Sequence, residues 1–81
     1  MEQKLIFTGY HDFDGKNGTH YNVLDFITEP KVSENGKRAT VANVTIFTSS
    51  EKYSNFIKSV KLMSLVSVKC EINGDKVRYF I

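Results

Sequence analysis

The chain of 81 residues contains one cysteine, one proline and no tryptophan. The single cysteine, Cys70, excludes an intramolecular disulfide and any metal site built from several cysteines of one chain. Val68 and Ile72 flank it at a spacing of two, which predicts a small buried side chain on the apolar side of a strand. No apolar run approaches the roughly 18 residues of a membrane span, and the start lacks the hydrophobic stretch of a signal peptide. We therefore expect a cytoplasmic protein that does not enter a membrane.

Strong net charge and catalytic motifs are also missing. The net charge is +2, from 11 Lys and Arg against 9 Asp and Glu, and only Arg38 and Arg78 are arginines. Arginine is favoured for bidentate reading of base edges, whereas lysine suits diffuse attraction to phosphates, so sequence-specific duplex binding is disfavoured. The sequence has no nucleophile elbow and no phosphate-binding glycine loop. We expect no enzyme activity and no cofactor.

What the sequence does contain is a succession of short strand patterns, enough for one domain over residues 1–81. β-Branched and aromatic residues, mostly in alternation, predict strands at 4–10, 21–28, 38–48, 65–72 and 76–81. Gly9 predicts a bulge in the first strand. Turn residues predict hairpin loops at 11–20 and 31–37, and Asn73-Gly74 predicts a tight type I′ turn before the last strand.

A helical pattern interrupts the strands after residue 48. The segment Thr48-Ser49-Ser50-Glu51 fits a capping box at a helix start. Apolar residues then recur at helical spacing, at Tyr53, Phe56, Ile57 and Val60, and predict an amphipathic helix to about residue 62. Three strands, a helix and a final hairpin are the order of the OB-fold. We therefore predict an all-β small barrel, OB-fold-like, with the order β-β-β-α-β-β and the helix covering one open end.

Aromatic and basic residues gather around the predicted hairpins, which favours binding of single-stranded nucleic acid. Proteins of this kind combine rings on which bases stack with a basic groove for the backbone. The candidate nucleic-acid-binding residues are Tyr10, Phe13, Lys16, His20, Tyr21, Lys37, Arg38, Lys69, Lys76 and Arg78. Phe13 is the best stacking candidate because a loop offers it no obvious core. Tyr21 is in phase with Val23 and fits a core position equally well, and DNA is not distinguished from RNA.

The second predicted strand is apolar on both faces, with Val23 on one side and Leu24 and Phe26 on the other. A surplus apolar face that binds no ligand is often a dimer interface, so we expect a homodimer. The alternative function is a protein-interaction module, such as a phage-encoded inhibitor or an assembly subunit, without nucleic-acid binding.

Histidine and aspartate pairs in the first predicted loop raise the question of a metal site. The residues are His11, Asp12, Asp14 and His20. They could ligate a divalent cation. The same residue types are also favoured in turns, and no strand or helix spacing places them on one face. We therefore predict no metal ligands, and a loop metal site stays a minor alternative.

The segment Gly15-Lys16-Asn17-Gly18-Thr19-His20-Tyr21 is a Gly/Lys turn leading into a tyrosine that opens a strand. It resembles the start of the second strand in small single-stranded-DNA-binding proteins of phages and plasmids, in particular the filamentous-phage helix-destabilising proteins. The resemblance covers the length, the strand order and this turn. It implies a homodimer that coats single-stranded DNA during phage DNA replication in the host cytoplasm, with Lys16 and Tyr21 as strand-binding positions. The chain is less basic than that family, and its predicted helix is longer.

Overall fold

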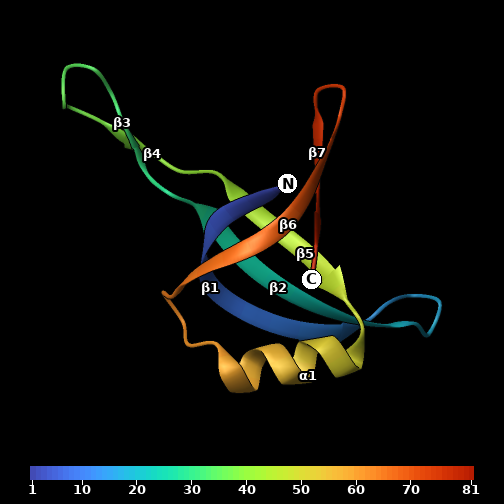
Figure 1. Ribbon diagram of the computed structural model, residues 1–81. Helices are drawn as coiled ribbons and strands as arrows, with labels where there is room; N and C mark the ends of the chain where they lie inside the picture. Colours follow the sequence, from blue (N-terminus) through green and yellow to red (C-terminus); the bar gives the residue numbers. More distant parts are fainter.

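The computed structural model describes all 81 residues, mostly as β-strands with one short helix (Figure 1). The elements are β1 (Glu2–Asp14), β2 (His20–Thr28), β3 (Lys31–Val32), β4 (Ala39–Thr40), β5 (Asn43–Thr48), α1 (Ser50–Ser59), β6 (Leu65–Asn73) and β7 (Lys76–Phe80). One antiparallel sheet of order β5-β2-β1-β6-β7 curls into a nearly closed barrel. β3 and β4 form a separate ribbon that projects from it. The predicted small all-β, OB-fold-like barrel is therefore confirmed. The single helix, α1, is too short and too polar to span a membrane.

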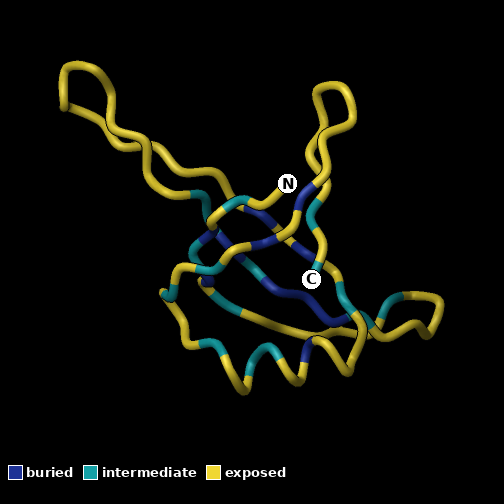
Figure 2. The backbone as a smooth tube through the Cα atoms, in the orientation of Figure 1, coloured by how far each residue is buried: buried dark blue, intermediate teal, exposed yellow.

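The core lies between the curled sheet and α1. Its buried members are Leu5, Phe7, Leu24, Phe26, Val44, Ile46, Tyr53 and Val68. The ring of Phe7 packs against those of Phe26 and of Phe56 in the helix, at centroid distances of 5.4 Å and 4.9 Å. Figure 2 shows the burial concentrated where the barrel strands cross, while the β3–β4 ribbon and the hairpin ends are exposed. The apolar face of the helix thus covers the barrel, as its spacing predicts.

The first strand is longer than the sequence predicts, since β1 continues to Asp14. Phe13 pairs with Tyr21 and Asp14 with His20, so Phe13 lies on a strand and the prediction of a loop there is wrong. Backbone pairing with β2 overrides the turn preference of the polar residues, because strand propensity depends strongly on context. The bulge is confirmed, because the register shifts between Phe7 and Gly9.

The predicted strand over residues 38–48 is interrupted. Ala39–Thr40 pairs with Lys31–Val32 in the ribbon, and only Asn43–Thr48 belongs to the barrel. At the junction the backbone N–H of Thr28 donates to the carbonyl oxygen of Ala42 at 2.9 Å. The segment predicted as a plain loop at 31–37 is therefore partly a β-ribbon.

The ends of the helix differ from the prediction by one to three residues. The N-cap is Ser49, whose hydroxyl accepts the backbone N–H of Lys52 at 3.3 Å. The reciprocal capping box over residues 48–51 is thus replaced by a single cap one residue later. The helix ends at Ser59 because Val60 is extended, with φ −118° and ψ 127°.

The last hairpin forms where predicted, with a different turn. Asn73 pairs with Lys76, so Gly74 and Asp75 are the two loop residues. Gly74 has φ +64°, whereas Asp75 is not among the positive-φ residues. Type I′ needs positive φ at both central positions, and glycine alone at the first position fits type II′.

Candidate nucleic-acid interface

Four aromatic side chains lie together on the outward face of β1, β2 and β5. We call this cluster the aromatic platform, and it consists of His11, Phe13, Tyr21 and Phe47. Phe13 is opposite Tyr21, while His11 and Phe47 are both opposite Val23. Directly opposed residues of antiparallel strands point to the same side, so all four share one face. The centroid distances are 6.0 Å for His11–Phe13, 5.3 Å for Phe13–Tyr21 and 5.8 Å for Tyr21–Phe47.

Val23 lies beneath the platform. It is only 1% exposed although its face points away from the main core. Val23 is thus a buried apolar residue outside the main core cluster, on the face that carries the rings. The rings themselves stay accessible, with exposed fractions of 42% for Phe13 and 58% for Phe47. The platform is thus a rigidly backed, solvent-facing aromatic surface.

The β1–β2 hairpin holds Tyr21 in place through its loop. A Cβ at Gly15 would lie 2.6 Å from Cε2 of Tyr21, so this ring needs glycine beside it. The backbone N–H of Gly15 donates to the carbonyl oxygen of Thr19 at 2.7 Å, and Asn17 accepts the N–H of Thr19 at 3.1 Å. These bonds close the loop and leave Lys16 in it beside the platform.

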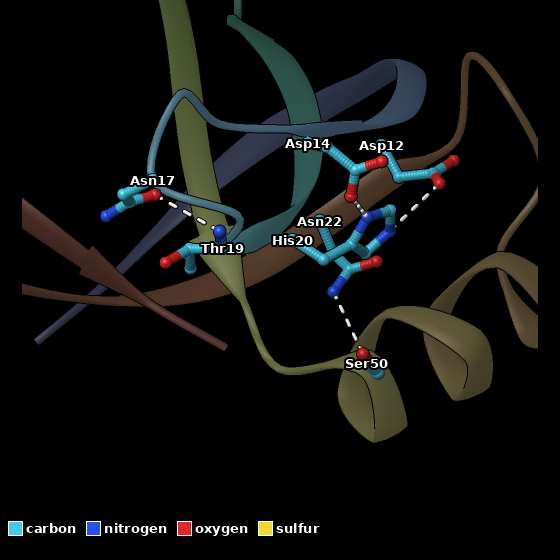
Figure 3. A network of polar contacts seen from close by, with 7 residues as sticks. All are labelled: Asp12, Asp14, Asn17, Thr19, His20, Asn22 and Ser50. Atoms are coloured by element: carbon cyan, nitrogen blue, oxygen red, sulfur yellow. Dashed lines mark hydrogen bonds and ion pairs between the residues drawn. The ribbon is translucent and has the colours of Figure 1, made fainter.

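Two predicted site residues lie on the opposite face of the same hairpin. Tyr10 points inward, where its ring lies 6.2 Å from Phe7 and 6.1 Å from Tyr53. His20 is held between two carboxylates, with 2.7 Å from Nδ1 to Asp14 and 3.0 Å from Nε2 to Asp12 (Figure 3). The structure thus separates Tyr10 and His20 from Phe13 and Tyr21.

The possible loop metal ligands do not form one site. His11 is on the outward face and pairs with Asp25 at 3.2 Å, away from the His20 cluster. No group of three or more His, Cys, Asp or Glu side chains is arranged to hold a metal ion. Both ring nitrogens of His20 are instead engaged by aspartates, which makes the cluster an ion-pair network.

The His20 network predicts a pH-dependent contribution to stability. The hydrogen bond to Asp14 raises the pKa of His20 above its ordinary 6.5, and the charges of Asp14 and Asp12 act in the same direction. A raised folded-state pKa stabilises the fold fully below the unfolded value of 6.5, and this contribution is lost as pH rises through the folded value. Replacing His20 by Gln should therefore lower the melting temperature more at about pH 5.5 than at about pH 8.5.

The measurement is a pair of thermal melts of both proteins at the two pH values. The variant Asp14→Asn serves as a control. It removes the carboxylate that pairs with His20 and should therefore reduce the same pH dependence. An equal loss of melting temperature at both pH values would show that the network does not act through the charge of His20.

The predicted basic residues occupy three places. Lys16 is in the β1–β2 loop, and Lys37 and Arg38 are in the loop of the projecting ribbon, which points away from that hairpin (Figure 1). Lys69, Lys76 and Arg78 lie on the outward face of β6 and β7. Every ion pair between side chains involves a histidine, so none of the lysines and arginines is paired with an Asp or Glu carboxylate. Their charges are available to an anionic ligand.

His11 and Phe47 are platform members that the sequence reasoning did not include. Phe47 carried a signal, because it alternates out of phase with the buried Val44 and Ile46. His11 carried none, because the bulge between Phe7 and Gly9 reverses the phase of the strand. Counting by twos from Phe7 puts residue 11 on the core side.

Comparison with protein-family models, curated proteins and solved structures finds no match to this chain.

Proposed function

We propose that the protein binds single-stranded nucleic acid, foremost DNA, without catalysis and with little sequence specificity. The observation that carries this proposal is the aromatic platform, four rings from three strands that share one outward face. Soluble proteins seldom leave contiguous apolar surface exposed unless it binds something. Aromatic rings on a barrel face stack on unpaired bases of any sequence, because every base has a π-face.

The charge distribution supports the same ligand. The Lys and Arg side chains make no ion pairs, so phosphates can approach them without displacing a carboxylate. Lys16 in the loop beside the platform is the nearest such charge along the chain. A duplex would offer its phosphates but would keep its bases stacked away from the rings, so single strands should be preferred.

We also propose that two copies associate as a homodimer. Ile6, Ile27 and Leu65 line up in register on the outward face, and Leu65 is largely exposed. This apolar row is separate from the platform and fits a protein partner better than a phosphate backbone. A role of phage or mobile-element type in a host cytoplasm is the biological setting that the turn at 15–21 suggests.

The nucleic-acid proposal is tested by fluorescence polarisation with a labelled oligo-dT. We expect binding at low micromolar protein in low salt, which weakens as salt is raised. Three to four phosphate contacts would give a slope of log affinity against log salt of roughly −2 to −3. A duplex of similar length is the control and should bind more weakly.

Failure to bind the oligo-dT, or binding that is indifferent to salt, would contradict the nucleic-acid proposal. The alternative of a protein-interaction module would then be favoured. Molar mass from light scattering of the free protein decides the homodimer independently, because a monomer would leave the platform argument intact.

A further inference from the structure

A second aromatic and basic surface lies next to the platform, across the seam of the barrel. β5 and β7 are the two edge strands of the sheet and are not hydrogen-bonded to each other. Between them runs an open groove of about 510 Å³, with Phe47 on one side and Arg78 and Phe80 on the other. Phe47 therefore belongs both to the platform and to this groove.

The groove is chemically suited to a nucleotide. Two of its eight lining residues, Lys52 and Arg78, are basic, and none has an acidic side chain. The guanidinium carbon of Arg78 lies 5.4 Å from the centroid of the Phe80 ring. Glu71 is opposite Arg78 on β6 but forms no ion pair with it. Arginine in this position can pair with a phosphate or stack on a base.

A hydrogen bond from the helix anchors the chain at one end of this groove. Nζ of Lys52 donates to the backbone carbonyl oxygen of Ile81 at 2.9 Å, which links α1 to the residue after β7. Tyr79, the neighbour of Phe80, points inward and its hydroxyl donates to Gln3 at 2.8 Å. These two bonds fix the end of β7, so Arg78 and Phe80 are presented outward from an anchored strand.

We propose that a single strand bound on the aromatic platform continues across the β5–β7 seam, where the next unpaired base and its phosphate are held by Phe80 and Arg78. This inference rests on the proposed function and adds a path and a length to it. Two features carry it: the continuity through Phe47 and the charge complementarity of a groove lined by Arg78 and by no Asp or Glu side chain. An oligonucleotide long enough to reach both surfaces gains the second contact, and a very short one does not.

The test compares two oligo-dT lengths, roughly 4 and roughly 12 nucleotides, which lie within the range of sites on such barrels. The variants are Arg78→Gln and Phe80→Leu. Each should weaken binding of the long oligomer about 5- to 50-fold, because one base contact is lost, and weaken the short one less than about twofold. Lys58→Gln is the control, since it removes an equal charge from an exposed position of α1 that does not line the groove.

Each outcome decides the inference. A length-dependent loss in the Arg78 and Phe80 variants that Lys58→Gln lacks supports the path across the seam. An equal loss for both lengths, or no loss for either, overturns it while wild-type binding keeps the proposed function standing. If the wild type binds neither oligomer, the proposed function itself fails. Should Phe80→Leu unfold, as a thermal melt would reveal, the exposed Arg78→Gln variant still gives the answer.

Discussion

Replacing Phe13 and Phe47 together by alanine should reduce the affinity for oligo-dT by well over tenfold and leave the barrel folded. Base stacking on one aromatic side chain contributes about 1–3 kcal/mol, so each single variant should lose roughly 5- to 150-fold. Both rings are exposed and lie outside the core cluster, so their own packing is a small part of the core energy. Fluorescence polarisation of the single and double variants, with the same labelled oligo-dT, measures the effect.

Tyr10→Leu is the matched control for this experiment. Tyr10 is on the same strand as Phe13 and is 50% exposed, against 42% for Phe13. It differs in facing inward, toward Phe7 and Tyr53. Its loss should leave nucleic-acid affinity within about twofold. If Tyr10→Leu weakens binding as much as the platform variants do, the ligand does not lie on the outward face.

Replacing Phe47 also exposes Val23 to water, and this loss of stability must be separated from the loss of base stacking. Val23 is buried on the outward side, and its neighbours there are His11 and Phe47. Alanine at position 47 should therefore lower the unfolding free energy by about 1 kcal/mol as part of Val23 meets water. A melt of each variant shows whether the protein is folded at the binding temperature.

The order of elements could be predicted from the sequence because each has a local signal. Turn residues separate the strands, alternation marks β6, and the helical spacing of Tyr53, Phe56 and Ile57 marks α1. All of these signals act within a few residues. The OB-like order follows from them without knowledge of any long-range contact.

The faces of the strands were less predictable, because one residue of register reverses the direction of every side chain. The bulge at Phe7/Gly9 is such a shift. It turns Tyr10 inward and His11 outward, opposite to a simple count from Phe7. The sequence located Gly9 but could not tell how the ladder resumes after it, since that depends on pairing with β2.

Tyr21 is a second residue whose exposure could not be predicted from the sequence. The sequence places Tyr21 in phase with the apolar Val23, so the tyrosine fits a buried position as well as a binding position. The structure keeps the two in phase and places both on the outward face. Burial of Val23 comes from the rings around it, which belong to three strands that are distant in sequence or joined by hairpins.

Replacing Phe7 by alanine should cost the fold about 3–5 kcal/mol, the usual loss for a buried phenylalanine. Phe7 is fully buried and its ring contacts those of Phe26 and Phe56, which join β2 and the helix to β1. A domain of 81 residues has a total stability of roughly 4–12 kcal/mol, so the variant should be marginally folded or unfolded at 25 °C. Urea unfolding followed by circular dichroism measures the change.

Phe47→Ala is the comparison that separates the two roles of aromatic residues in this protein. The same chemical change at an outward position should retain most of the stability and lose binding, whereas Phe7→Ala should lose the fold itself. A cost below about 1.5 kcal/mol at Phe7 would be too small for a buried phenylalanine and would contradict its place in the core. If instead Phe47→Ala unfolded the protein and Phe7→Ala lost only binding, the faces of β1 and β5 would be reversed. Stability and binding measured on one pair of variants therefore test the register on which the platform depends.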